Sequence, residues 1–324
     1  MIFAVLVAAL GAACLLALGS GDQPLPLREV LGALTGAPET SPVATTIVTT
    51  LRLPRVALAA AVGAALGLAG AATQALLRNP LAEPGLLGIN AGAALAAMLV
   101  IVQIASLPEA ALPLVTFAGA LAMAALIQLF AWRQGASTLR LILVGVGLGA
   151  MAGAGASFVA AFGPAAEVQR AMVWAAGSLQ DARWVKIVWL AQWGAPAAAL
   201  LWLMARELDL IALGDRVASG VGQRVHLVRG LGVLGVAMLS GAAVAASGPI
   251  AFVGLAAPHM ARRLVGRPHA RLLPASALLG ALLLVLADLA ARRVLAPVQV
   301  PVGLATALLG APFFGLLLWR KRDG

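Results

Sequence analysis

Residues able to bind a metal ion or act as nucleophiles are few in this chain of 324 residues. The histidines, His226, His259 and His269, are spread along the sequence, whereas metal ligands usually converge from close, paired spacings. The single cysteine, Cys14, excludes an intramolecular disulfide and a cysteine-rich metal site. We therefore expect no metal site, and we expect His259 to be structural.

Machinery for ATP hydrolysis is also missing from the sequence. A phosphate-binding loop needs a glycine-rich turn that ends in Lys-Ser or Lys-Thr. The only lysines are Lys186, which precedes an isoleucine, and Lys321, which precedes an arginine. No paired carboxylates or Ser/His pair are visible within the apolar stretches, which disfavours an intramembrane enzyme. We expect no catalytic residue and no cofactor in this chain.

Arginines stand at the ends of two apolar stretches. Arg52 and Arg55 precede one stretch, and Arg292 and Arg293 end another. The planar guanidinium group suits bidentate pairing with a carboxylate, as in docking to an acidic partner. Alternatively, these arginines are interfacial, with charged heads in water and stems in lipid. Asp288 lies four residues before Arg292, on the same helical face, and could orient it.

A polar segment at 206–229 interrupts the apolar sequence. Asp215 could cap a short helix there by accepting backbone N–H bonds, and Gly220 and Gly222 would end that helix. A short helix lying along the membrane would give a partner protein a rigid handle to push on. The alternative is a solvated surface loop.

Composition identifies the setting in which these residues act. Hydrophobic residues make up 62% of the chain and charged residues 10%, with a mean hydropathy of +1.01. Soluble domains carry about 25% charged residues, so this chain has too little polar surface for a water-facing fold. The composition therefore predicts an integral membrane protein. In such a protein the net charge of +10 indicates basic cytoplasmic loops rather than nucleic-acid binding.

Apolar stretches between the charged residues predict the number of membrane helices, since a span needs about 20 residues. Nine stretches are visible, and the longest contains Ser247-Gly248-Pro249, which would break a helix. We therefore expect ten helices in a single all-α membrane domain covering residues 1–324. The expected helices are 1–21, 56–77, 84–108, 110–132, 141–166, 187–205, 230–246, 250–264, 272–287 and 294–319.

Orientation follows from the basic residues. With ten spans both termini share one side, and Arg320-Lys321-Arg322 places that side in the cytoplasm. Only Asp288 lies deep in a span, near its end. An ion-coupled secondary transporter, the alternative from a different class, would be expected to carry intramembrane carboxylates.

Four motifs, in order along the chain, resemble the permease subunits of ABC importers for iron-siderophores, heme and cobalamin, the FecCD type. The resemblance implies the ten-helix fold of a type II importer permease in the bacterial inner membrane. It also implies the partners: a second permease copy in a homodimer, two ATPase subunits that bind ATP and Mg²⁺, and an extracytoplasmic binding protein. The motifs are RLPR with GAALGLAG, Gln74 and RNPLAEPGLLG in 52–88, FVGLAAPHMARR in 252–263, ADLAAR in 287–292, and VPVGLATALLGAPFF in 300–314.

The resemblance assigns roles at both ends of the molecule. Arg52, Arg55 and Arg292 match positions that receive glutamates of the binding protein, and the neighbouring Arg293 could share that role. On the other side, segment 206–229 becomes the coupling segment that docks into a groove on the ATPase. Its central residues are Leu213, Gly214, Asp215 and Arg216.

The resemblance also implies a gate and a path for the cargo. Ser137 and Thr138 occupy the position of the cytoplasmic gate, although Leu139 replaces a residue that is often polar in relatives. By the same resemblance the helix that follows, the fifth, and the tenth helix would line the path between two permeases, with the stripe Gly145, Gly149 and Gly153 on the fifth. Such a stripe otherwise indicates close helix packing.

The cargo is the least determined feature. Trp174-Ala175-Ala176-Gly177-Ser178-Leu179 is most similar to siderophore permeases, whereas NPLAEPGLLG is equally close to heme and cobalamin permeases. We expect a ferric siderophore, with heme or cobalamin as the alternatives.

Overall fold

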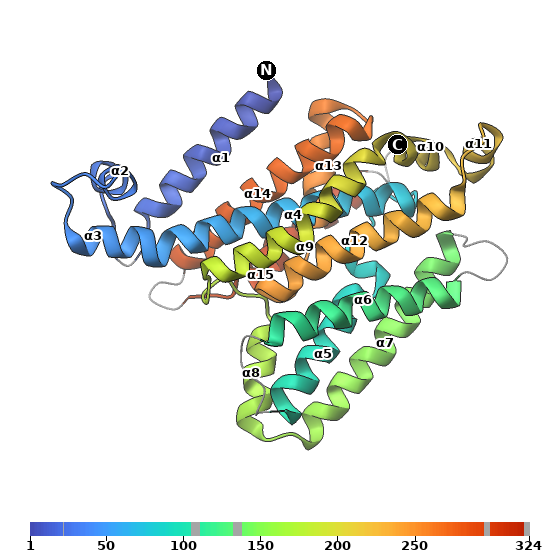
Figure 1. The fold of residues 1–324 in the computed structure, drawn as a ribbon, viewed down its shortest axis with the longest axis horizontal. Coiled ribbons are helices and arrows are strands. Elements are labelled where there is room, and N and C mark those ends of the chain that lie inside the picture. The colour runs from blue at the N-terminus through green and yellow to red at the C-terminus, as the bar shows by residue number, and fades with distance from the viewer. Residues whose placement is uncertain (22, 105–110, 132–137, 295–298, 321–324) are drawn as a thin grey trace.

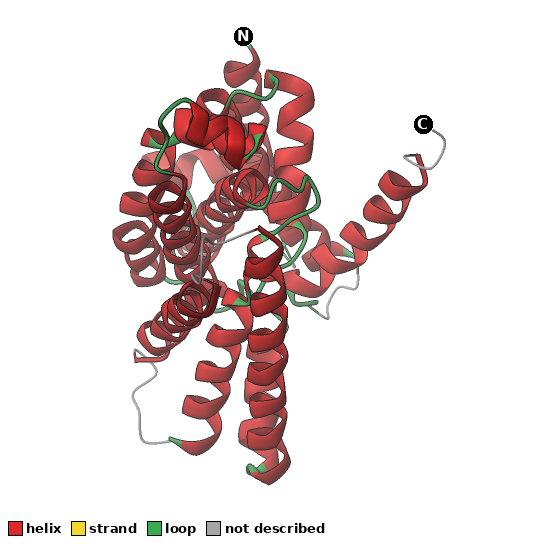
Figure 2. Ribbon diagram, turned by 90° about the vertical axis from the view of Figure 1, so that its right-hand side faces the viewer, coloured by secondary structure: helices red, strands yellow, loops and turns green. Residues whose placement is uncertain are grey.

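The computed structural model describes residues 1–21, 23–104, 111–131, 138–294 and 299–320. All regular structure in these residues is helical (Figure 1, Figure 2). Ten helices correspond in order to the ten expected ones, which confirms the all-α fold. They are α1 (Ile2–Gly19), α4 (Leu53–Leu76), α5 (Ile89–Gln103), α6 (Leu112–Ala131), α7 (Thr138–Phe162), α9 (Trp184–Leu203), α12 (Val225–Ser247), α13 (Val253–Val265), α14 (His269–Arg293) and α15 (Val302–Arg320).

Shorter elements connect these helices. Two of them, α10 and α11, make up most of the segment between α9 and α12, where the sequence predicted a short helix. The connecting elements are α2 (Leu27–Thr35), α3 (Pro42–Thr46), the π-helical η1 (Ile47–Arg52), the 3-10 turn η2 (Pro84–Leu87), α8 (Ala165–Ala175), α10 (Ala205–Leu213) and α11 (Asp215–Gly220).

The lengths of the helices make this chain a multi-pass membrane protein. Within the described residues, α1, α4, α6, α7, α12 and α14 are each long and apolar enough to cross a membrane. α9 meets the same condition together with α10, from which it is bent by 59°. α5, with 15 residues, and α13, with 13, are shorter, as is the apolar run 302–312 of α15.

The break predicted at Ser247-Gly248-Pro249 is confirmed. α12 ends at Ser247 and α13 begins at Val253. Gly248 has φ +71°, a left-handed conformation that favours glycine, and a side chain on it would overlap the backbone carbonyl of Trp174. The break therefore depends on a glycine as well as on the proline.

Helix α4 lies at the centre of the molecule and packs against α14, α12, α13 and α9. Its contact with α14 is made by backbone atoms, because Gly63 and Gly67 face Gly280 and no side chain intervenes. A methyl group on any of these glycines would overlap backbone atoms of the opposite helix. Small residues permit this close approach, which is a main source of helix affinity inside lipid.

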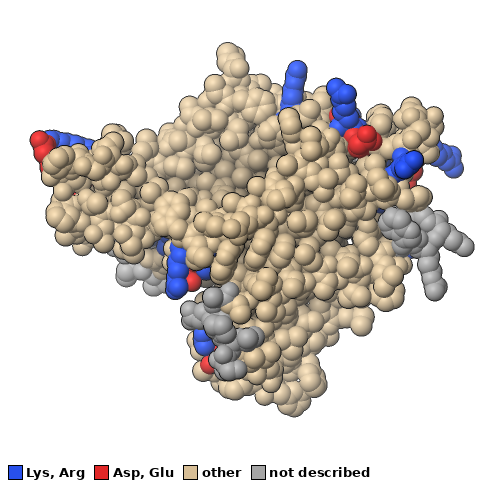
Figure 3. Space-filling model, viewed as in Figure 1, with Lys and Arg blue, Asp and Glu red and all other residues tan. Residues whose placement is uncertain are grey.

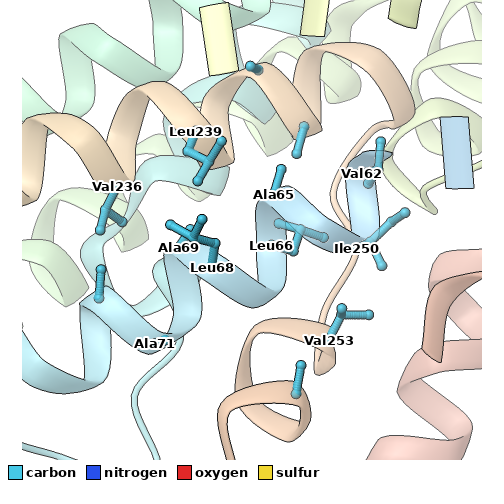
Figure 4. Close-up of a cluster of buried hydrophobic side chains, with 14 of the residues drawn as sticks. Val62, Ala65, Leu66, Leu68, Ala69, Ala71, Val236, Leu239, Ile250 and Val253 are labelled. Atoms are coloured by element: carbon cyan, nitrogen blue, oxygen red, sulfur yellow. The ribbon is translucent and has the colours of Figure 1, made fainter. Parts of the chain in front are cut away.

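Alanine, valine and leucine side chains of α4 pack against the neighbouring helices (Figure 4). Leu66 and Leu68 are buried in the cluster that Figure 4 draws, with Leu239 of α12 and Val253 of α13 around them. α4 therefore joins the short helix α13 and the long helix α12 in one core.

Helices α5, α6, α7 and α8 form a second group that projects from the first (Figure 1). α6 contacts α12 and links the two groups. α7 is the least covered of the long spans, and its buried residues are only Leu141, Gly145, Ala152 and Val159. The rest of its apolar surface is available to lipid or to another protein chain.

Replacement of Gly280 by alanine tests the central contact. The added methyl group would overlap the carbonyl of Gly63, so Gly280→Ala should lower the free energy of unfolding by about 1–3 kcal/mol, as overpacking does. Thermal unfolding in detergent measures the effect. Gly147→Ala on α7 is the control, since no atom lies within 4 Å of its added methyl group. Equal melting temperatures for the two variants would contradict the contact.

Candidate functional site

The four arginines predicted to dock a partner lie together at one end of the bundle. Arg52 is the last residue of η1, and Arg55 lies in the first turn of α4. Arg292 and Arg293 lie in the last turn of α14. Because α4 and α14 run antiparallel and in contact, the start of one helix meets the end of the other. We call this group the arginine cluster.

Asp288 is the centre of the arginine cluster. Its Oδ1 lies 2.9 Å from Arg55 Nη2, and its Oδ2 lies 3.1 Å from Arg292 Nε. The three side chains are buried, at 12% exposed for Arg55, 2% for Asp288 and 8% for Arg292. One carboxylate thus forms ion pairs with two guanidinium groups. Buried charges need such partners because burial removes them from water. The expectation that Asp288 orients Arg292 is confirmed, but its pairing with Arg55 was missed.

The end of helix α1 is the second partner of the arginine cluster. Arg52 Nη1 donates to the carbonyl of Leu18 at 2.7 Å, and Arg292 Nη1 donates to the carbonyl of Ser20 at 3.2 Å. The last carbonyls of a helix lack intrahelical partners and carry partial negative charge, so cations stabilise them. The arginines therefore attach α1 to the pair α4 and α14.

The four side chains of the arginine cluster differ in their exposure to solvent. Arg293 is exposed and donates through Nη2 to Ser20 Oγ at 3.0 Å, whereas Arg52, Arg55 and Arg292 are largely buried. The sequence predicted a docking role for these four arginines, and the structure brings them to one place. The sequence did not reveal the partners that Arg52, Arg55 and Arg293 have within the chain, and the docking role stays a prediction.

At the opposite end of the bundle, α10 and α11 form the segment predicted to couple to an ATPase. Gly214 separates them with φ +113°, which a residue with a side chain rarely adopts. Leu213 is 67% exposed, and Val217 and Val221 continue an exposed apolar surface along α11. Arg216 is exposed beside them. Apolar side chains held out on a rigid corner are suited to a groove on another protein.

The prediction that Asp215 caps a helix is wrong. α11 begins at this residue, but no side-chain capping bond forms. Its carboxylate instead accepts from Arg229 Nη2 at 2.7 Å, and Arg78 Nη1 lies 3.9 Å away. The guanidinium of Arg229 on α12 is buried, and a buried charge without a partner is strongly destabilising. Asp215 therefore pairs with Arg229 instead of capping α11. Asp215 thereby fixes α11 to α12.

His269 and Asp209 link the coupling segment to α14. The backbone N–H of His269 donates to Asp209 Oδ1 at 2.9 Å, and Nδ1 of the same residue lies 2.6 Å from this oxygen. His269 is buried at the first turn of α14, and Asp209 lies on α10. His269 therefore has a structural role, which the sequence predicted for His259 alone.

Of the predicted gate residues, Ser137 lies outside the described residues. Thr138 is the first residue of α7, and its Oγ1 accepts from Arg78 Nη2 at 3.4 Å. Arg78 also approaches Asp215, so the start of α7 and the coupling segment share this arginine.

The three glycines predicted to line a path have different surroundings. Gly145 is buried, and a side chain there would come within 2.8 Å of the Leu86 carbonyl. Gly149 is in ordinary contact distance of Gly88, and no atom lies within 4 Å of a side chain added at Gly153. Gly145 thus packs against η2, whereas the surface at Gly153 is open.

A cavity of about 660 Å³ lies beneath α8, near the end of the bundle that holds the arginine cluster. Trp174, from the stretch similar to siderophore permeases, lines it together with Arg170 and Lys186. Lys186 Nζ lies 3.1 Å from Asp181 Oδ2. Charged and aromatic groups therefore line one space in the part of the chain that the structure describes.

Charged side chains on the face shown in Figure 3 gather toward the two ends of the bundle and leave an uncharged band between them. The arginine cluster and the coupling segment lie at opposite ends of α14, which joins His269 to Arg293. This arrangement suits a protein that crosses a membrane and meets a different partner on each side.

Comparison with known proteins gives consistent matches over nearly the whole chain. The sequence matches the FecCD transport family over residues 9–320. It is 40% identical to the Fe(3+) dicitrate transport system permease protein FecD of Escherichia coli (strain K12), covering 97% of this chain and 96% of that relative. It is 42% identical to the hemin transport system permease protein HmuU of Yersinia pestis, covering 84% and 83%.

A solved structure is similar to this chain in fold over almost its full length. It is an inward-facing conformation of an ABC transporter assigned to the metal-chelate type, with a TM-score of 0.89 and 30% sequence identity. The match covers 98% of this chain and 99% of the solved one.

Removal of the charge of Asp288 tests the arginine cluster. Asp288→Asn leaves two buried guanidinium groups without a counter-charge, so the free energy of unfolding should fall by about 3–5 kcal/mol. The melting temperature of the purified protein measures this loss.

Asp181→Asn is the matched control, because Asp181 also pairs with two cations, Arg183 and Lys186, but is 60% exposed. Its loss should cost at most about 1 kcal/mol. A melting temperature of Asp288→Asn equal to that of the control would show that this carboxylate does not hold α4 and α14 together.

Proposed function

The chain belongs to the FecCD transport family as a membrane-spanning permease of an ABC importer, and we propose that its cargo is a ferric siderophore. Similarity along almost the full length of a ferric dicitrate permease is the observation that carries the proposal. The Bacillus subtilis relative named a probable siderophore transport system permease protein, 36% identical over 100% of this chain, supports the same cargo class. Heme is the second candidate because the hemin permease is similarly close.

ATP hydrolysis on separate subunits supplies the energy in this proposal. The chain has no Lys-Ser or Lys-Thr phosphate loop, and α10 and α11 hold out Leu213 and Val217 as an apolar docking surface. One ATPase subunit, with its ATP and Mg²⁺, binds to each permease copy. Binding and hydrolysis of ATP then shift the permease between outward-open and inward-open arrangements.

A second copy of this chain completes the path. α7 is the most exposed of the long spans and carries large apolar side chains such as Leu143, Met151 and Phe158 on its uncovered face. Exposed apolar surface on this scale marks an interface with lipid or protein. The open surface at Gly153 lets a bulky chelate pass between two copies of α7, which supports a homodimer with the path at its centre.

The arginine cluster receives an extracytoplasmic binding protein. Arg293 offers an exposed guanidinium, and carboxylates of the partner compete with the α1 carbonyls for Arg52 and Arg292. Docking therefore loosens the attachment of α1, and the pair with Asp288 keeps Arg55 in position.

The chain lies in the inner membrane with both termini in the cytoplasm. The end of α1 contacts the arginine cluster, and Gln299, just before α15, accepts from Arg55 Nη1 at 2.8 Å. α1 and α15 therefore both extend from the arginine cluster toward the end that holds the coupling segment. This arrangement supports a shared side for the two termini.

Reconstitution of the permease with its ATPase and binding protein in proteoliposomes tests the function. Uptake of iron-loaded siderophore should require ATP and exceed the uptake of heme or cobalamin. Uptake driven by an ion gradient in the absence of the ATPase would contradict the importer mechanism. Preferential uptake of heme or cobalamin would contradict the cargo alone.

Leu213→Asp should disrupt the docking of the ATPase. A charge at this exposed apolar position has to be desolvated in the groove, so affinity should fall at least about tenfold. Co-purification of the tagged ATPase measures the loss. The control is Leu34→Asp on α2, which is also exposed and apolar but lies before the arginine cluster, at the opposite end. Equal loss in both variants would contradict a specific docking surface.

A further inference from the structure

Phe252 has a backbone conformation that its side chain disfavours. Its φ is +68°, and Arg78 is the only other described residue besides glycine with a positive φ. The left-handed conformation costs about 1–2 kcal/mol for such a residue and persists only where the surroundings impose it. Phe252 immediately precedes α13, and its backbone N–H donates to Glu83 Oε2 at 3.2 Å.

Glu83 is bound to this strained residue by that hydrogen bond. It lies in the turn between α4 and η2, with its carboxylate at the start of α13, where the helix dipole favours a negative charge. Burial raises the pKa of the Glu83 carboxyl, whereas the hydrogen bond from Phe252 lowers it. The contact with the start of α13 offsets only part of this burial, so the pKa of Glu83 stays above its ordinary value. We call Glu83 and Phe252, with their hydrogen bond, the joint.

The joint touches α7 on one side and α15 on the other, the fifth and the tenth of the ten expected helices, which line the path in the proposed importer. On one side, the ring of Phe252 packs directly on Gly310 of α15, where a side chain would overlap the ring. On the other side, η2 follows Glu83 and presents the Leu86 carbonyl to Gly145 of α7. α15 therefore contacts Phe252, and α7 contacts η2, which follows Glu83. The joint thus links α7 and α15, although neither of its residues belongs to either helix.

The opposite end of α13 lies beside the coupling segment. Arg262 donates to Gln74 Oε1 and so attaches the last turns of α13 to α4. Arg262 and Gln74 line a cavity of about 310 Å³ together with Asp209, Leu213 and His269. α13 has 13 residues and thus spans about 20 Å from this cavity to the joint.

We propose that Glu83 and Phe252 are positioning residues that make α7 and α15 move together when the coupling segment moves. The inference rests on the proposed importer function. Displacement of α10 reaches α13 through α14, which packs against both helices and whose His269 is bound to Asp209 of α10, and α13 carries it to the joint. At the joint, the displacement passes to α15 through the ring of Phe252 and to α7 through η2. The path then opens and closes as one unit.

Transport measurements separate the joint from a purely structural role. Phe252→Gly keeps the left-handed backbone but removes the ring, and should reduce ATP-driven uptake about tenfold while ATP hydrolysis stays within about twofold of the native rate. Phe117→Ala is the matched control, because Phe117 is a buried ring stacked on Trp193 of α9, away from the joint. The control should lower the melting temperature and leave the ratio of uptake to hydrolysis unchanged.

A double variant tests the contact itself. Gly310→Ala should impair uptake because its methyl group overlaps the Phe252 ring, and adding Gly310→Ala to Phe252→Gly should cause no further loss, because the ring that the methyl group would overlap is gone. Additive losses in the double variant, or equal losses of uptake and hydrolysis in Phe252→Gly, would overturn the joint.

Distance measurements provide a readout that needs no cargo. Nitroxide labels are attached at Val146→Cys on α7 or at Leu308→Cys on α15, in a Cys14→Ser background that removes the single native cysteine. In the native complex, trapping of the ATPase with ATP and vanadate should change the distance between the two copies at both positions. In Phe252→Gly, the change at Leu308 should be lost and the change at Val146 retained.

Each outcome of this experiment decides a different claim. Native-sized changes at both positions in Phe252→Gly would overturn the joint. Changes in the native complex without uptake of any siderophore would overturn the cargo and leave the joint supported. Absence of any change in the native complex would overturn both the importer mechanism and the joint.

Discussion

The backbone contact between α4 and α14 is the constraint on which the rest of the structure depends. Gly63, Gly67 and Gly280 bring two helices together with no side chain between them. Inside lipid there is no hydrophobic force to join two apolar helices, so close packing of this kind supplies the affinity. The contact also fixes the register of the two helices, because each glycine accommodates only the backbone atoms that face it.

That register determines what meets at each end of the pair. At one end it sets Arg55 beside Asp288, whose carboxylate also holds Arg292. At the other end, α14 begins at His269, which is bound to Asp209 of the coupling segment. A single rigid pair therefore joins the proposed docking site for the binding protein to the proposed docking site for the ATPase.

Patterns that act locally along the chain could be predicted from the sequence. The lengths of the apolar stretches gave ten helices, the Gly-Pro break divided α12 from α13, and the spacing of four residues placed Asp288 on the face of Arg292. Contacts between distant residues could not be predicted in the same way. Arg55 and Asp288 are 233 residues apart, and Phe252 and Glu83 are 169 apart, so no periodicity relates them. The sequence predicted that Asp215 caps a helix. Its actual partner is the buried cation Arg229, and no pattern near Asp215 in the sequence indicates that pairing.

In the proposed mechanism, a signal at the arginine cluster reaches the coupling segment on the other side of the membrane. The most direct measurement is the rate of ATP hydrolysis by the assembled importer in nanodiscs, with and without the cargo-loaded binding protein. The loaded binding protein, which binds on the opposite side of the membrane from the ATPase in this mechanism, should change this rate, and Asp288→Asn should weaken the response in complexes that still assemble. An identical rate with and without the binding protein would contradict this mechanism.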